Sequence, residues 1–231
     1  MPIIRIVSGG QTGADIGALD AAIHCRIEHG GWIPKGRKQE NGKTIPDKYQ
    51  LREIDSPDYL KRTEANVVDS DATLILTYGP LTGGSKATME FAKKHGKPCL
   101  HIALDEYSRK DVVNFVKRWF EGDICKPIPP DNCILNVAGN RESKAPGIRQ
   151  AVMVRMVDIL TELNGLSVYP LSDDYDLDEN EGISIENADL SHLEGAARTL
   201  GQQSIELYHP KSIEEAVQIV LEQTPKAAKD A

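Results

Sequence analysis

Short apolar segments that alternate with amphipathic segments constrain the fold of this chain more than any other feature. Each apolar segment is brief and apolar throughout, which is typical of strands in a parallel sheet covered by helices on both faces. The segments expected as strands are Ile3–Val7, Thr73–Thr77, Cys99–Ala103 and Cys133–Val137. The segments expected as helices are Ala14–Arg26, Asp58–Val68, Lys86–His95, Lys110–Glu121 and Gly147–Asn164. The pattern predicts an α/β fold, a Rossmann-like parallel sheet flanked by helices, as a ligand-binding domain over residues 1–164.

Composition agrees with a globular protein that buries a substantial core. The chain has 231 residues, of which 40% are hydrophobic and 27% are charged. No segment approaches the roughly 18 consecutive apolar residues of a membrane span, so we expect no association with a membrane. The four cysteines and six histidines show no spacing typical of metal ligands or of a disulfide framework. We therefore expect a cytoplasmic protein with reduced thiols and without a bound metal ion of its own.

Charge separates residues 165–231 from the rest of the chain. This segment contains 14 acidic and 4 basic residues, whereas the whole chain has a formal net charge of −8. The preceding residues are near neutral and lack a basic stripe, so we expect no nucleic-acid partner. We expect an acidic linker and then a small C-terminal βα appendage, whose helix begins with a capping box of Ser212 and Glu215. The segment either keeps the protein in solution or competes with an anionic ligand in a salt-dependent way.

The turn after the first expected strand points to an anion. Glycines let the backbone approach a ligand closely, and the N–H groups at the start of the following helix attract negative charge. The turn is neither a Walker A loop nor a Gly-x-Gly-x-x-Gly motif, and a tight turn with packing glycines is the alternative interpretation. If it holds a phosphate, a side chain at Gly10 should block the ligand without touching the core. The candidate binding residues here are Ser8, Gly9, Gly10, Gln11, Thr12 and Gly13.

Further turns with polar residues follow two other expected strands. The carboxyl ends of parallel strands meet at one edge of a sheet, so these turns should face the same ligand. The candidates in them are Gly83, Gly84, Ser85, Thr88, Arg141 and Ser143. Between the first two turns, Lys35 and Arg37 follow a Trp-Ile-Pro segment that is suited to packing against a flat ring. These two cations either neutralise a phosphate or belong to a solvated basic loop.

Three other charged residues have two interpretations each. Asp15 is either a polar residue at a helix start, favoured by the helix dipole, or a hydrogen-bond acceptor for a ribose, a base or a pterin. Arg62 and Glu64 are either ligand contacts or a surface pair.

Together these segments resemble a known family. The resemblance lies in "SGGQTGADIGALDAA", "GGWIPKGRK", "YLKRTEANVVDSDATLIL", "GGSKATMEFAKKHGKP" and "NVAGNRESKAPGI", which follow one another in this order. They are similar to the proteins named putative molybdenum carriers, a circularly permuted branch of the SLOG superfamily of lysine-decarboxylase-like proteins. The resemblance implies binding of the molybdenum cofactor (molybdopterin, a phosphorylated pterin) or of a nucleotide. It also implies a homo-oligomer, tetramer or dimer, and molybdenum-cofactor-handling enzymes as partners. The pocket residues it implies are Gly9, Gly10, Thr12, Gly13, Lys35, Gly36, Arg37, Gly83, Gly84, Ser85 and Thr88.

The related cytokinin-activating phosphoribohydrolases carry the motif Pro-Gly-Gly-x-Gly-Thr-x-x-Glu, which this chain keeps only in part. Its third glycine is replaced in the region of Lys86 and Ala87, whereas Glu90 stands at a comparable place. We therefore expect a carrier without catalytic activity. One alternative is a nucleotide phosphoribohydrolase that uses Glu90, and with it Arg62, beside the N-glycosidic bond. Another is a nucleotide-binding sensor whose acidic tail engages a second protein.

A test of base release separates the carrier from the hydrolase. Because the glycine motif is incomplete, incubation with nucleoside monophosphates should release no more free base with this protein than with its Glu90→Gln variant. Chromatography of the reaction mixture measures the released base. Release that disappears in Glu90→Gln would make the chain a hydrolase.

Overall fold

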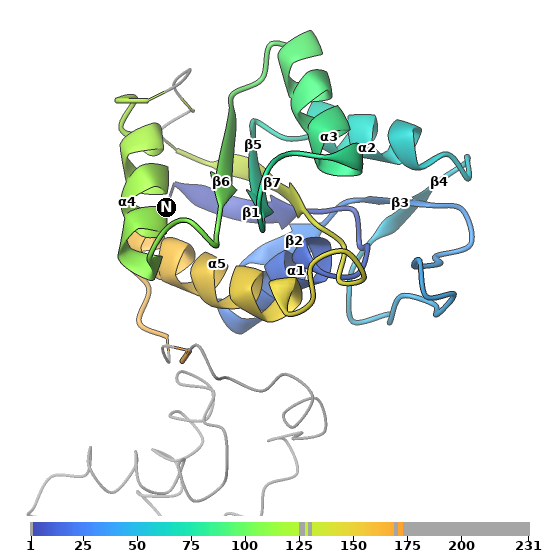
Figure 1. The fold of residues 1–231 in the computed structure, drawn as a ribbon, viewed down its shortest axis with the longest axis horizontal. Coiled ribbons are helices and arrows are strands. Elements are labelled where there is room, and N and C mark those ends of the chain that lie inside the picture. The colour runs from blue at the N-terminus through green and yellow to red at the C-terminus, as the bar shows by residue number, and fades with distance from the viewer. Residues whose placement is uncertain (1, 125–127, 129–130, 169–170, 173–231) are drawn as a thin grey trace, which may run out of the picture. The chain divides into compact units, whose positions relative to one another are not determined.

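The computed structural model describes residues 2–124, 128, 131–168 and 171–172. It shows a mostly parallel sheet with helices on both of its faces (Figure 1), which confirms the predicted Rossmann-like α/β fold. The expected βα appendage, and with it any competition between the acidic tail and a ligand, lies outside the described residues. None of the helices in the described part of the chain is long and apolar enough to cross a membrane.

The main sheet of the described residues has five strands in the order β2-β1-β7-β5-β6, and all its neighbouring strands are parallel. Every residue of β5 is buried, as expected for a strand covered on both faces. Along the chain the sheet grows outward from β1 to β2 and, in the other direction, from β5 to β6, with β7 between the two halves. This reversal of strand order is the place where α/β sheets bind ligands. The strands are β1 Ile3–Val7, β2 Glu28–Gly30, β5 Ala72–Thr77, β6 Cys99–Ala103 and β7 Cys133–Gly139.

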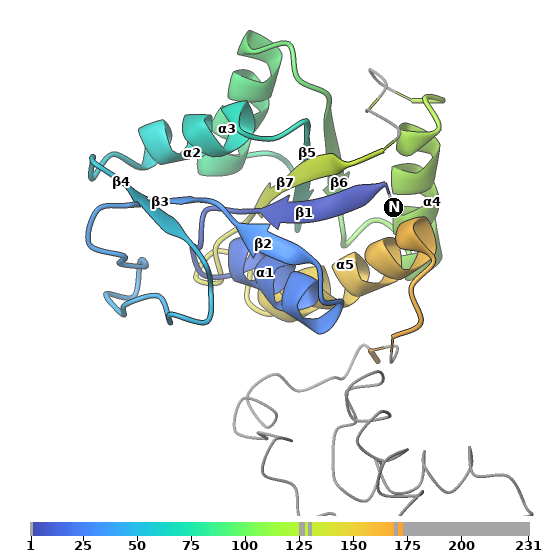
Figure 2. The ribbon, with the colours of Figure 1, turned by 180° about the vertical axis from the view of Figure 1, so that it is seen from behind.

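Helices cover both faces of this sheet. Figures 1 and 2 show α1 and α5 on one face and α2 and α3 on the other, with α4 beside α5. The helices are α1 Ala14–His24, α2 Tyr59–Val68, α3 Gly83–Lys94, α4 Arg109–Phe120 and α5 Ile148–Asn164. At its C-terminal end α5 is joined to β1, since the side chain of Asn164 accepts from the Ile3 N–H (3.1 Å) and donates to the Ile3 carbonyl (2.7 Å).

The strands and helices expected within residues 1–164 are all present, with ends that differ by a few residues. The largest difference is at α3, which begins at Gly83 instead of Lys86, so the second glycine turn lies in the first turn of the helix itself. The short strands β2, β3 (Trp32–Pro34) and β4 (Arg52–Ile54) were not expected. A segment of three residues is too short to show a hydrophobic period, which explains the omission.

The segment between β3 and β4 forms a small hairpin over residues 37–45. Lys38 and Thr44 pair in an antiparallel bridge, and the Ile45 N–H donates to the Arg37 carbonyl at 2.9 Å. The base of the hairpin is anchored by buried Ile45, which lies in one cluster with Leu51 of the same segment and with Ile16 and Leu19 of α1. Hydrogen bonds within the hairpin therefore keep its shape, and the apolar packing of Ile45 holds it against α1.

Helices α1 and α5 are in close contact at Gly17. A Cβ placed there would lie 2.2 Å from the carbonyl oxygen of Arg149, a backbone atom that can move only with its helix. Gly84 in α3 is the opposite case, because no atom lies within 4 Å of its would-be Cβ.

These two glycines provide a matched test of the helix contact. Alanine is favoured over glycine within a helix by about 1 kcal/mol, so Gly84→Ala should leave the free energy of unfolding unchanged or slightly raised. Gly17→Ala should lower it by about 1–3 kcal/mol, because the helices must separate to admit the methyl group. Denaturant unfolding measures both. A Gly17→Ala protein as stable as Gly84→Ala would show that α1 and α5 separate without cost.

Candidate functional site

A cavity of about 210 Å³ lies at the carboxyl ends of the strands, where β1, β7, α2 and α3 meet. It is the place at which the strand order reverses, as expected for a ligand site in this kind of sheet. Half of the residues predicted from the sequence contribute to its lining. These are Gly9, Gln11, Thr12, Gly84, Ser85, Thr88 and Arg141.

A buried ion pair forms one wall of the cavity. The guanidinium of Arg62 donates from Nη1 to Oδ2 of Asp15 at 3.1 Å, and both side chains are about nine-tenths buried. The same carboxylate oxygen accepts the Gln11 N–H at 3.1 Å. Gly9 is required beside this pair, since a Cβ there would lie 1.2 Å from Arg62 Nη1. The first glycine of the turn thus makes room for a guanidinium at the ligand site.

Burial raises the pKa of Asp15 above its ordinary value, although Arg62 and the Gln11 N–H both favour the carboxylate. The buried Nε of Arg62 has no hydrogen-bond partner among the described residues, which adds to the free-energy cost of burying the pair. Asp15 therefore holds the guanidinium of Arg62 in a fixed position at the cavity wall.

A second guanidinium and an aromatic ring lie nearer the surface of the cavity. The ring of Tyr59 has the guanidinium of Arg141 at 5.5 Å from its centroid and that of Arg62 at 5.9 Å. Arginine stacks on flat rings and binds phosphate oxygens with two N–H groups at once. The cavity can therefore contact both a phosphate and a planar group.

Polar side chains on the remaining walls are hydrogen-bonded within the protein. Ser85 donates to the Gly139 carbonyl (2.8 Å), and Thr88 donates to the Gly84 carbonyl (2.9 Å). Asn66 accepts the Trp32 N–H (2.7 Å) and donates to the Trp32 carbonyl (3.1 Å). These groups fix the shape of the cavity, and its positive charge comes from the two arginines.

Glu40, at the turn of the 37–45 hairpin, makes several polar contacts beside the cavity. Its carboxylate accepts hydrogen bonds from the hydroxyls of Thr12 and Ser143, and Nη1 of Arg141 lies 3.6 Å from its Oε2. Partial burial by itself would raise the pKa of Glu40, but these hydrogen bonds and Arg141 hold it below its ordinary value. Glu40 is therefore the ionised partner of three residues that the sequence assigned to a ligand.

The structure places Lys35 and Arg37 away from the cavity. Lys35 is exposed and pairs with Asp55 at 2.8 Å. Arg37 donates from Nη1 to the Leu51 carbonyl at 3.0 Å and so joins the two ends of the segment between β3 and β4. The sequence left both residues as either phosphate contacts or members of a solvated basic loop, and in the structure groups of their own segment hold the two side chains.

Five residues of the predicted turns also lie outside the lining, namely Ser143, which contacts Glu40 as described above, and Ser8, Gly10, Gly13 and Gly83. Gly10 has φ +66°, and a Cβ there would meet Leu51 Cδ1 at 2.6 Å. A side chain at Gly10 would thus disturb the core, and our expectation that it would act on the ligand alone is corrected. Gly13 has φ +83° and admits the Asn140 carbonyl to 2.5 Å of its would-be Cβ. Ser8 is buried and donates to the Val137 carbonyl at 2.6 Å, while Gly83 begins α3.

Several residues of the cavity were missed by sequence reasoning or left with two interpretations. Asp15 and Arg62 belong to the site, whereas Glu64 is a surface partner of Lys94 at 2.7 Å. Tyr59, Asn66 and Asn136 were not considered, although the charged and polar positions of α2 gave a signal for Asn66. Glu90 is exposed and is not part of the lining. In the described residues, no three His, Cys, Asp or Glu side chains are grouped to hold a metal ion.

Comparisons with known proteins agree with the sequence motifs. Residues 6–160 match the Circularly permutated YpsA SLOG family. The chain is also similar to a crystal structure described as a putative molybdenum carrier protein from Syntrophus aciditrophicus SB, with 47% identity and a TM-score of 0.61. That similarity covers 68% of this chain and 94% of the other. No curated protein matches the chain. The resemblance indicated by the sequence is confirmed.

The buried ion pair should behave as a single unit in stability measurements. Asp15→Asn leaves Arg62 charged and unpaired, and Arg62→Met does the same to Asp15, so each should lower the free energy of unfolding by about 3 kcal/mol or more. The double variant should lose less than the sum of the two, with a coupling of about 0.5–3 kcal/mol. Denaturant unfolding of all four proteins measures this coupling. Purely additive losses would contradict a direct interaction.

Proposed function

We propose that this chain, which belongs to the Circularly permutated YpsA SLOG family, binds and carries a phosphorylated pterin, with the molybdenum cofactor as the favoured cargo. One observation carries the proposal above all: the guanidinium groups of Arg62 and Arg141 converge, with the ring of Tyr59, on a cavity between two glycine turns. A phosphorylated pterin combines an anionic group with a flat polar ring. The similar protein of Syntrophus aciditrophicus, described as a molybdenum carrier, supports the same cargo.

One further detail of the cavity fits such a cargo. The backbone at Gly84 is open, since no atom lies within 4 Å of its would-be Cβ, so a ligand can approach the first turn of α3. The N–H groups and the dipole at that helix start favour negative charge.

A carrier needs these groups to bind and release its cargo, and it needs no catalytic group. The hydrolase alternative assigns the key carboxylate to Glu90, which is exposed and is not part of the lining. The carboxylate that does line the cavity, Asp15, is paired with Arg62. This geometry favours binding over hydrolysis. With the resemblance, we further propose a cytoplasmic homo-oligomer, dimer or tetramer, that delivers its cargo to molybdenum-cofactor-handling enzymes.

Titration with defined ligands tests the cargo and the site together. Arg141→Gln should weaken binding of a phosphorylated pterin by about tenfold or more, equivalent to about 1.4 kcal/mol. The substitution removes an exposed guanidinium that donates hydrogen bonds to the phosphate, and it leaves the core undisturbed. Lys35→Gln is the matched control: it removes one positive charge outside the cavity and should leave the affinity unchanged. Calorimetry measures both affinities.

Mass spectrometry and the same titration together distinguish the cargo classes. Mass spectrometry of small molecules that copurify with the native protein should find a phosphorylated pterin. Tighter binding of a nucleoside monophosphate than of the pterin would make the protein a nucleotide binder. An equal loss of affinity in Arg141→Gln and Lys35→Gln would show that the ligand does not bind in the cavity.

A further inference from the structure

We infer that Thr12, Ser143 and Arg141 form the oxyanion subsite of the cavity, and that Glu40 is an internal anion that a phosphate group must displace to bind there. The inference rests on the proposed function for the identity of the whole cargo. The subsite itself requires only a ligand with a phosphate or a similar oxyanion.

The donors around Glu40 are those that a phosphate accepts from. The hydroxyls of Thr12 and Ser143 donate to its two carboxylate oxygens, the latter at 2.7 Å, and the Ser143 N–H donates at 3.4 Å. Arg141 adds an ion pair at 3.6 Å. Hydroxyls, a backbone N–H and a guanidinium at one point are a donor set typical of phosphate recognition.

The subsite is continuous with the cavity. Thr12 and Arg141 both line the cavity. Glu40 contacts both residues, although 28 positions separate it from Thr12 in the sequence. The cavity volume of about 210 Å³ is small compared with the roughly 300–1,000 Å³ of common ligand sites. Removal of the Glu40 carboxylate adds space at the side where Arg141 lies, which a phosphorylated pterin needs.

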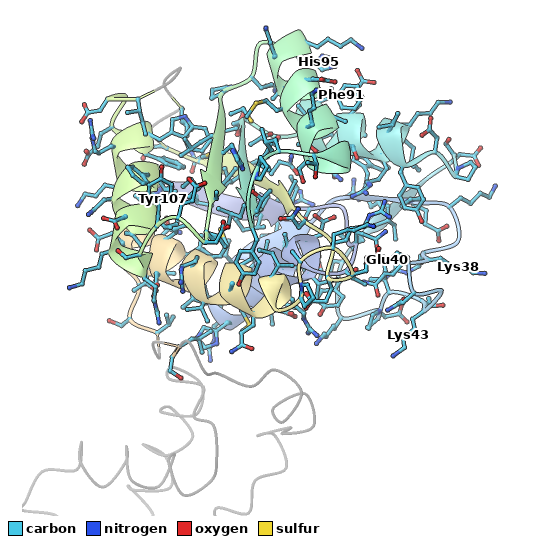
Figure 3. The ribbon with its side chains drawn as sticks, viewed as in Figure 1. Lys38, Glu40, Lys43, Phe91, His95 and Tyr107 are labelled. Atoms are coloured by element: carbon cyan, nitrogen blue, oxygen red, sulfur yellow. The ribbon has the colours of Figure 1, made fainter. Side chains whose placement is uncertain are left out.

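The hairpin that carries Glu40 is held together by hydrogen bonds of its own. Within it, Ile45 donates to the Arg37 carbonyl (2.9 Å) and Gly42 donates to the Gln39 carbonyl (3.0 Å). Near its tip the hairpin contacts the glycine turn, where Gln39 donates to the Gly10 carbonyl (3.0 Å) and the Glu40 N–H donates to Gln11 (2.9 Å). Figure 3 shows Glu40 directed toward the body of the protein and Lys38 and Lys43 directed away. Release of Glu40 therefore leaves the hairpin's own bonds intact.

Charge favours the exchange. A phosphate monoester carries about −1.5 to −2 charges near pH 7 and three acceptor oxygens, whereas Glu40 carries one charge and two oxygens. Arg141 is 45% exposed in its side chain, so little rearrangement of the core accompanies the exchange. A ligand that lacks the phosphate has nothing to offer these donors and must compete with a carboxylate already in place. Glu40 thus selects for phosphorylated ligands.

Inorganic phosphate is the probe that tests the subsite. In an NMR titration of the full chain, Glu40→Ala should bind phosphate about tenfold more tightly than the native protein, a difference of about 1.4 kcal/mol. The backbone resonances of Thr12 and Ser143 should report this binding. Glu40→Gln keeps the shape of the side chain and should shift the affinity in the same direction. Asp47→Asn is the matched control, because it removes one exposed carboxylate from the same segment without touching the subsite.

Hydrogen exchange provides an independent reading of the hairpin. Saturating phosphate should speed exchange at the Glu40 N–H, which is bonded across to Gln11, and leave the Ile45 N–H, bonded within the hairpin, unchanged. Equal phosphate affinity in Glu40→Ala and native protein, or an equal gain in Asp47→Asn, would overturn the inference. So would phosphate shifts confined to other residues, or no phosphate binding at all. A protein that passes this test but binds no phosphorylated pterin retains the subsite and loses the carrier proposal.

Discussion

The ion pair of Asp15 and Arg62 is the interaction on which the candidate site depends. Asp15 comes from the first turn of α1 and Arg62 from α2, helices that lie on opposite faces of the sheet (Figures 1 and 2). The pair therefore connects the two faces across the ends of the strands. Gly9 leaves the space that the guanidinium occupies, because a Cβ there would overlap it. One residue without a side chain thus places a charged group beside the backbone of the first turn.

Two kinds of polar contact meet at this site and differ in how easily they exchange. The Asp15–Arg62 pair is about nine-tenths buried, and loss of either partner would leave a charge in a medium that solvates it poorly. The contacts of Glu40 with Thr12, Ser143 and Arg141 lie nearer to water, which can replace them at small cost. The buried pair therefore keeps the shape of the cavity while the outer contacts are free to respond to a ligand.

Most of the fold could be predicted from the sequence, because the apolar strands and the helices with one apolar face carry their own periodic signal. Strands β2, β3 and β4 could not, since three residues show no period. The glycine turns were recognised, but Gly10 packs against Leu51, a contact across 41 positions that no local pattern contains. The positions of Lys35 and Arg37 outside the lining could not be predicted, because charge density does not show which carbonyl or carboxylate a side chain reaches. Glu40 was missed for the same reason: its partners Thr12 and Ser143 are brought near it only by the fold.

The contact between Ile3 and Asn164 has a consequence for the order of segments along the chain. Two hydrogen bonds hold the start of β1 to the end of α5, although 161 positions separate them. Strand β1 and helix α5 are therefore neighbours in space. The sheet does not depend on the chain being unbroken at any particular surface loop. A polypeptide opened at the exposed tip of the hairpin, near Asn41 and Gly42, and closed by a short linker between residues 164 and 3, would contain the same strand neighbours and the same cavity. In this sense the arrangement of strands and helices is cyclic.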